Sequence, residues 1–148
     1  MMIDYETYKT EHITLNNEKM ERLKELISIY ISKYGLKKNI IRKNGSSYYL
    51  KHVCERLLGH YISNMDLKEA MKQLNVSNNT VLNKTYHDEN LNIYYPFFKK
   101  MIIEMDNDSR NIEKVNCIIC NSEYKTVHII PKLNLTYCSN CDKVLDVK

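Results

Sequence analysis

The residues best suited to chemistry in this sequence are two C-x2-C pairs near its C-terminus. Their members are Cys117, Cys120, Cys138 and Cys141. In a reducing compartment, paired cysteines of this spacing are typical of a tetrahedral zinc site, because each pair can place two thiolates about 2.3 Å from one ion. A disulfide is disfavoured in such a compartment, and a redox pair is disfavoured because no βαβ pattern surrounds either motif. We therefore expect structural Zn²⁺, with another metal as the alternative.

The stretch between the two pairs has the pattern of a short antiparallel hairpin. Residues 123–130 alternate and are rich in β-branched side chains, Pro131 follows, and residues 133–137 alternate again. Two short strands between two C-x2-C pairs resemble a zinc ribbon. Metal binding would supply on the order of 10 kcal/mol of folding free energy to a segment too small to build its own core. We therefore expect chelation to unfold residues 115–145 first.

The same segment also resembles the zinc-stapled treble-clef core of HNH endonucleases. The shared residues are the string VHIIP at 127–131, the pair Asn-Leu that begins at Asn134, and the second C-x2-C pair. The resemblance implies that His128 is a general base and that Asn134 orients it. Val127 stands where that family has an acidic residue, and Asp142 would be a substitute metal ligand. The plainer interpretation of His128 is a strand residue with one packed face.

Upstream of the cysteines, the hydrophobic pattern is helical. Residues 17–34 carry apolar side chains at spacings of three and four, and Gly35 is placed to end that helix. A second amphipathic helix is predicted to begin with Ser46 or Ser47 as its cap. Its inward stripe comprises Leu50, Val53, Cys54, Leu57, Leu58 and Tyr61.

Cys54 and the nearby histidines need no metal to explain them. Cys54 falls within the apolar stripe, which indicates a core thiol. His52 and His60 flank the stripe and have no partner spacing that suggests a metal site. We expect both histidines to lie at the surface or to be half-buried.

A helix, a short turn and a capped helix are predicted within residues 66–87. Asp66 and Glu69 match a capping box at the start of the first helix. The inward face of that helix comprises Leu67, Ala70, Met71 and Leu74. The turn is Asn75-Val76-Ser77, and Ser77 is placed to cap the second helix over residues 78–87.

This arrangement resembles the helix-turn-helix of DNA-binding regulators, with Asn75 in the left-handed turn position and Val76 between the helices. The resemblance implies a DNA-reading face that consists of Asn78, Asn79, Asn83 and Lys84. Asparagine can bind an adenine edge through two hydrogen bonds, and lysine can meet guanine or phosphate. A basic run would anchor the phosphates, and it comprises Lys37, Lys38, Arg42 and Lys43. The alternative for this run is a solvated loop.

A third resemblance concerns the source of the chain. Residues 47–56, 61–64 and 69–71 resemble a helical stretch found in small proteins of phages and bacterial mobile elements. Such elements encode repressors, and they also encode inhibitors of host defence nucleases. The resemblance therefore implies either a transcriptional regulator or an anti-CRISPR-like inhibitor that binds a host nucleoprotein.

Aromatic and polar segments precede the cysteines. Residues 94–98 read YYPFF, and Pro96 lies near the start of a short helix predicted over residues 99–105. Next to Lys99 and Lys100 these rings could stack on bases, but packing of the helical part is the preferred interpretation. Residues 106–111 are polar throughout and are predicted to be a linker.

Composition bounds the remaining possibilities. The 148 residues carry a formal net charge of +4 and contain three glycines, without a Gly-rich phosphate loop. No run is long enough for a membrane span, and no signal peptide is apparent. We expect a mainly α fold, with a helical domain over residues 1–106 and a zinc-ribbon domain over residues 107–148. The favoured function is a DNA-binding regulator in the cytoplasm of a bacterial host cell, without catalysis and with homodimerisation as an option. The alternatives are the inhibitor and a degenerate HNH-like nuclease.

Overall fold

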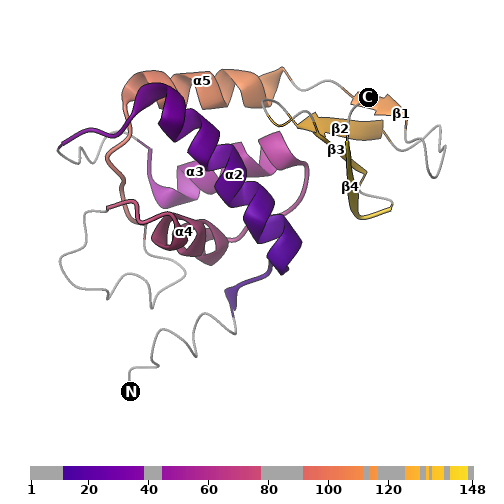
Figure 1. Ribbon diagram of the computed structural model, residues 1–148, viewed down its shortest axis with the longest axis horizontal. Helices are drawn as coiled ribbons and strands as arrows, with labels where there is room; N and C mark the ends of the chain where they lie inside the picture. Colours follow the sequence, from indigo (N-terminus) through magenta and orange to yellow (C-terminus); the bar gives the residue numbers. More distant parts are fainter. Residues whose placement is uncertain are drawn as a thin grey trace.

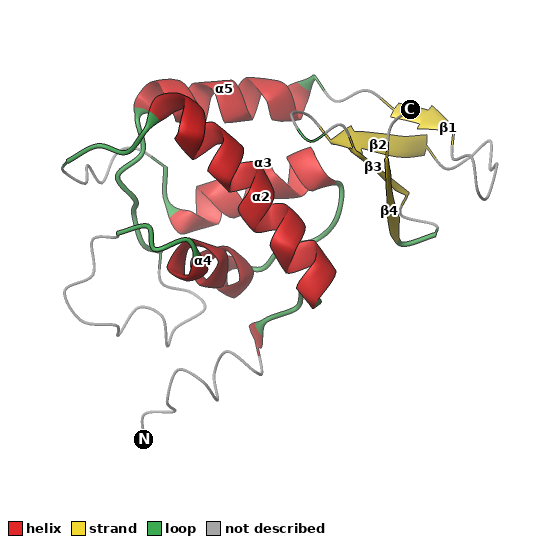
Figure 2. Cartoon of the chain, in the orientation of Figure 1, coloured by secondary structure: helices red, strands yellow, loops and turns green. Residues whose placement is uncertain are grey.

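The computed structural model describes residues 12–38, 45–77, 92–111, 114–116, 126–130, 133, 135–138 and 141–146, with only the backbone described for residues 114–116, 126–130, 136 and 143–146. The described helices are α2 (Asn17–Tyr34), α3 (Ser47–Leu58), α4 (Asn64–Gln73) and α5 (Lys99–Arg110). The described strands are β1 (Lys114–Asn116), β2 (Thr126–Ile130), β3 (Leu135–Cys138) and β4 (Lys143–Asp146). The chain is therefore mainly helical, as predicted, with its strands gathered after the last helix (Figure 2).

Helix α2 has the predicted bounds. The side chain of Asn16 accepts a hydrogen bond from the backbone N–H of Lys19, which satisfies one of the free donors of the first turn. Gly35 follows the last residue with φ 74°, a backbone conformation that glycine adopts without steric cost. The buried face consists of Met20, Leu23, Leu26, Ile27 and Tyr30.

Helix α3 begins as predicted but ends earlier than the apolar stripe implies. Ser46 is the cap, and its Oγ accepts the N–H of Tyr49. Gly59 adopts the left-handed conformation directly after Leu58 and ends the helix. Tyr61 therefore lies beyond the helix and is 62% exposed, so its prediction as a core residue is wrong. Cys54 is fully buried, as predicted.

Helix α4 begins at Asn64 and not at Asp66. Ser63 is the cap: its Oγ accepts the N–H of Asp66, and a carboxylate oxygen of Asp66 accepts the N–H of Ser63. The predicted capping box of Asp66 with Glu69 is therefore wrong by one turn, because Asp66 occupies the third helical position of a box that Ser63 opens. Residues 64–71 are all buried, so this helix packs on all sides.

Helix α5 is longer than predicted, because residues 106–110 continue it. The prediction of a polar linker over residues 106–111 is thus wrong. The polar side chains in this part bind other helices: Asp108 accepts a hydrogen bond from the Tyr30 hydroxyl, and Asp106 accepts one from Arg56. Such contacts with other helices stabilise the last turns of α5, although the polar sequence of these turns alone predicts a loop.

The helices share one hydrophobic core. Helix α2 crosses in front of α3, while α4 lies below this crossing and α5 lies above it (Figure 1). Buried side chains from all four of these described helices belong to a single cluster, together with Ile93, Tyr95 and Phe97 from the segment before α5. That segment also forms isolated bridges, Leu36 with Phe97 and Ser46 with Tyr94, so it joins the end of α2 to the start of α3.

The described strands form one antiparallel sheet in the order β1-β2-β3-β4. The predicted hairpin between the cysteine pairs is present as β2 and β3, with Ile130 opposite Leu135. Strands β1 and β4 were not predicted; they flank this hairpin on either side. The sheet lies beside the C-terminal end of α5 (Figure 1), and Leu135 and Tyr137 of β3 belong to the same hydrophobic cluster as the helices.

Candidate functional site

The second cysteine pair sits in a tight turn between two paired strands. Cys138 ends β3 and is opposite Lys143, the first residue of β4. The backbone N–H of Cys141 donates to the Sγ of Cys138 over 3.5 Å, and Asp142 turns the chain with φ 52°. This N–H, directed at the first sulfur, brings the second cysteine back toward it. The turn is therefore suited to present two sulfurs to one cation.

The first cysteine pair lies outside the described residues, but the strand before it is described. His128 of β2 is opposite Lys114 on one side and opposite Tyr137 on the other. Lys114, His128 and Tyr137 thus form one row across three strands. From this row, β1 runs on to Asn116 and β3 runs on to Cys138 in the same direction. Strand β1 therefore ends at the edge of the sheet where the Cys138 turn lies, one peptide bond before Cys117.

The nuclease-like residues are described only in part. His128 lies in β2, where its backbone pairs with both neighbouring strands, while its side chain and all of Asn134 lie outside the described residues. Asp142, the expected substitute ligand, contacts helix α2: its Oδ1 lies 2.8 Å from Lys19 Nζ and accepts the Tyr137 hydroxyl over 2.6 Å. Hydrogen bonds from Lys19 and then Tyr137 lower the pKa of this carboxyl.

Around Asp142, the cysteine turn is docked on the helices by aromatic contacts. Tyr137 is 5% exposed, and burial together with its hydrogen bond to Asp142 raises the pKa of its hydroxyl. The His60 ring meets the Tyr137 ring edge-on at a centroid distance of 5.3 Å, and Lys19 Nζ lies 5.6 Å from the Tyr137 centroid. Burial lowers the pKa of His60, which favours its neutral form at this contact. His60 is half-buried, as predicted.

The first half of the predicted helix-turn-helix is described, and it ends in a defined turn. The N–H of Asn75 donates to the carbonyl of Lys72, and the N–H of Val76 donates to the carbonyl of Met71. With Asn75 at φ 58°, these bonds form a Schellman motif. Val76 is 6% exposed and belongs to the core. The left-handed Asn75 and the packed Val76 are thus both confirmed.

The DNA-reading residues predicted after this turn lie outside the described residues: Asn78, Asn79, Asn83 and Lys84. Within the basic run, Arg42 and Lys43 also lie outside. Lys37 and Lys38 follow the end of α2, where Lys38 is exposed and Lys37 is half-buried. The described residues therefore include two of the four members of the basic run and none of the residues predicted to read bases.

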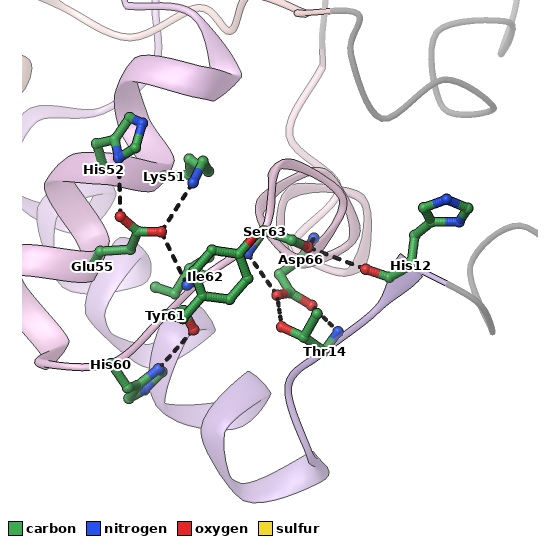
Figure 3. A network of polar contacts seen from close by, with 10 residues as sticks. All are labelled: His12, Thr14, Lys51, His52, Glu55, His60, Tyr61, Ile62, Ser63 and Asp66. Atoms are coloured by element: carbon green, nitrogen blue, oxygen red, sulfur yellow. Dashed lines mark hydrogen bonds and ion pairs between the residues drawn. The ribbon is translucent and has the colours of Figure 1, made fainter. Parts of the chain in front are cut away.

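A polar cluster that the sequence analysis missed links α3 to the turn before α4 (Figure 3). Glu55 accepts Lys51 Nζ at 3.0 Å and the N–H of Ile62 at 3.2 Å, and His52 Nδ1 lies 2.9 Å from its other oxygen. Burial of Glu55 raises its pKa, but the hydrogen bond from Lys51, then those from Ile62 and His52, lower it further than burial raises it. The i,i+4 spacing of Lys51 and Glu55 is a signal that could have located this cluster.

Two tyrosines flank the cluster at the surface. Lys51 Nζ lies 5.4 Å from the ring centroid of Tyr48 and 5.0 Å from that of Tyr61. Tyr48 is 52% exposed and Tyr61 is 62% exposed. The Lys51 charge is balanced by Glu55, so this tyrosine surface has two exposed aromatic rings and little uncompensated charge.

Asp66 attaches residues 12–15 to the start of α4 through its carboxylate (Figure 3). Its carboxylate accepts the N–H groups of Thr14 and Leu15 as well as the Thr14 hydroxyl. Ser63 Oγ donates to the carbonyl of His12. The capping pair of α4 is therefore also a tertiary contact that holds residues 12–15.

Among the described residues, no group of three or more His, Cys, Asp or Glu side chains is arranged to hold a metal; two of the four predicted ligands are not among them. None of the described helices combines the length and the apolar character that a membrane span requires. Comparison with protein families, with curated proteins and with solved structures gave no match.

Proposed function

We propose that this chain is a zinc-containing DNA-binding protein that acts as a transcriptional regulator. The observation that carries the proposal is the Schellman turn at Asn75 and Val76 after the buried helix α4. A helix-turn-helix needs a sharp turn after its first helix, with an apolar residue packed between the two helices. Asn75 supplies the turn and Val76 supplies the packed residue, which supports residues 78–87 as the DNA-reading helix.

Zinc has a bracing role in this proposal. The Cys138 turn and the end of β1 share one edge of the sheet, which favours a single site for both C-x2-C pairs. The site would hold the sheet together beside the helices, and its ligands would be Cys117, Cys120, Cys138 and Cys141. Because Asp142 contacts Lys19 and Tyr137, it is better explained as a docking residue than as a ligand for catalytic metal. We propose no catalytic activity.

The experiment that tests DNA binding is an anisotropy titration against the DNA upstream of the protein's own gene. Zinc is determined on the same sample. The affinity should fall steeply with salt concentration, because neutralised phosphates release their counterions. Asn79→Ala or Asn83→Ala should remove the preference for this DNA over an unrelated duplex. Asn107→Ala, an exposed asparagine on α5, is the matched control and should keep that preference. Absence of DNA binding at low salt would reject the regulator.

The tyrosine surface favours a second candidate function, an inhibitor that binds a host nucleoprotein. Exposed tyrosine beside balanced charge is typical of the centre of a protein interface, where aromatic residues are enriched and charged residues are depleted. Tyr48→Ala with Tyr61→Ala should then abolish inhibition of a purified host nuclease, while Asn79→Ala leaves the inhibition intact. The opposite result, with DNA binding lost only in Asn79→Ala, favours the regulator.

A further inference from the structure

Two basic stretches that are far apart in the sequence lie side by side in the fold. Leu36 forms an isolated antiparallel bridge with Phe97, and the N–H of Lys37 donates to the carbonyl of Pro96 over 2.7 Å. The end of α2 and the start of α5 are accordingly neighbours (Figure 1). We name the lysines of these two neighbouring segments the lysine surface: Lys37, Lys38, Lys99 and Lys100.

The lysine surface differs from seven other described cations, each of which forms an ion pair with a described acid. No carboxylate among the described residues pairs with any of its lysines. Elsewhere, described cations pair with nearby acids: Lys19, Arg22, Lys24, Lys33, Lys51, Arg56 and Arg110. Even Lys33, one turn before the surface on α2, is neutralised by Glu104. Four described cations without an acidic partner among the described residues thus lie in two neighbouring segments.

The start of α5 adds to this positive potential. Lys99 and Lys100 occupy its first turn, which contains no acidic residue, and Phe98 makes no side-chain capping hydrogen bond. Cations in the first turn of a helix oppose its dipole, whereas an anion at the same end is favoured. The lysine pair therefore makes the isolated helix less stable and makes it more attractive to a polyanion.

Apolar side chains are interleaved with the lysines. Phe98 is 38% exposed and Leu36 is 41% exposed. Lys37 Nζ lies 6.0 Å from the Phe98 ring centroid, so the ring holds one cation at the surface through a cation–π contact. This contact joins a lysine of the segment after α2 to the residue directly before α5.

We propose that the lysine surface binds the phosphate backbone of nucleic acid. This inference rests on the proposed DNA binding. It assigns the phosphate contacts to lysines of two segments, the one after α2 and the start of α5. Cations without described acidic partners on two neighbouring segments can meet successive charges of a phosphate chain. Since phosphate contacts carry no base information, the surface adds affinity and orientation and leaves sequence preference to residues 78–87.

The test uses two double variants of the full chain, Lys37→Gln with Lys38→Gln and Lys99→Gln with Lys100→Gln. Each is titrated with the upstream DNA at several salt concentrations. Arg22→Gln with Lys24→Gln is the matched control, because it removes the same charge from ion-paired positions on α2. The slope of log affinity against log salt is negative, with a magnitude of about 0.9 per phosphate contact. Each double variant removes two such contacts, so the magnitude of the slope should fall by about 1.8. Each should also weaken binding by about tenfold or more at low salt.

The outcomes separate this inference from the proposed function. If wild type binds the DNA and both lysine variants keep its salt slope, the lysine surface is not a phosphate contact and the DNA-binding proposal stands. If wild type binds no DNA at low salt, both proposals fail. Binding of wild type to phosphatidylserine-containing vesicles, without binding to DNA, would overturn the inference in favour of a membrane surface. Far-UV circular dichroism of each variant checks that the helices are retained, and a variant that lost them would be replaced by the corresponding single substitutions.

Discussion

In the helical part, buried side chains from α2, α3, α4 and α5 pack against one another, whereas the sheet residues Leu135 and Tyr137 pack into that same helical cluster. Helices α2, α3 and α4 also begin at local capping residues of their own: Asn16, Ser46 and Ser63. The described part of the sheet is held by strand pairing and by its contact with α2 and α3. The difference suggests that the helices can fold around their own core and that the sheet depends on them and on the proposed metal.

Removal of the metal should have the largest effect, and it should be confined to the sheet. A strong chelator should abolish the amide protection of β2, β3 and β4, because the ion would supply on the order of 10 kcal/mol there. The protection of α2 and α3 should persist. Hydrogen exchange read by mass spectrometry measures both regions in one experiment. Cys138→Ser should reproduce the loss without chelator, and unchanged sheet protection in metal-free protein would contradict the proposed site.

A cavity in the helical core should, in contrast to metal removal, destabilise the helices. Leu26 is fully buried on α2, so Leu26→Ala should lower the free energy of unfolding by about 2–5 kcal/mol. Urea denaturation followed at the helical circular dichroism band measures the change. The control is Ile103→Ala on α5, where the side chain is 49% exposed and the change should stay within about 0.5 kcal/mol. Equal effects of the two substitutions would be inconsistent with the described core.

The Glu55 cluster should make part of the helical stability dependent on pH. Hydrogen bonds from Lys51, Ile62 and His52 outweigh burial and lower the pKa of Glu55 below its unfolded value of about 4.3. The carboxylate therefore stabilises the fold above that pH, and the contribution is lost as the pH falls through the folded pKa. Glu55→Gln should cost about 1–3 kcal/mol at pH 7. It should also flatten the dependence of urea stability on pH below about 5. A variant with the wild-type pH profile would assign the acid sensitivity to other groups.

The smallest effect is expected at the ion pair that docks the cysteine turn. Asp142 is 60% exposed at its side chain, so Asp142→Asn should cost at most about 1 kcal/mol. The change should appear as faster hydrogen exchange in β3 and β4, while α4 is unaffected. Glu25→Gln, which removes an exposed pair with Arg22 on α2, is the control and should leave the sheet unchanged. Slower exchange in Asp142→Asn would mean that the ion pair does not fasten the sheet.

The fold could be predicted from the sequence where local signals decide the structure. The helix over residues 17–34, the cap at Ser46 and the left-handed Asn75 each follow from side-chain spacing or backbone preference within a few residues. The bounds of α5 could not be predicted in this way, because Asp106 and Asp108 are helical through contacts with Arg56 and Tyr30, which are distant in sequence. The start of α4 is hard to predict because both Ser63 and Asp66 are good capping residues. Hydrogen bonds from Thr14 to Asp66 favour the capping box in which Ser63 is the cap and Asp66 is the third helical residue.

The candidate sites also differ in whether local sequence or contacts between distant segments define them. Cysteine spacing alone predicts the metal ligands, since the motif is local in each pair. The lysine surface and the cluster around Glu55 depend on which segments meet, which spacing does not indicate. The sequence shows that Lys37 and Lys99 are basic, but it does not show that the bridge between Leu36 and Phe97 brings their segments together. The DNA-reading helix over residues 78–87 stays a prediction.

The segment before α5 contacts both ends of the connection between α2 and α3. Phe97 forms a bridge with Leu36, and Tyr94 forms a bridge with Ser46. Ser47 strengthens the second contact, since its N–H donates to the carbonyl of Ile93 and its Oγ accepts the N–H of Ile93. A protease cut within residues 39–44 would consequently leave two fragments that stay associated and migrate as one particle until a denaturant separates them. The covalent link between α2 and α3 is in this sense dispensable once the chain has folded.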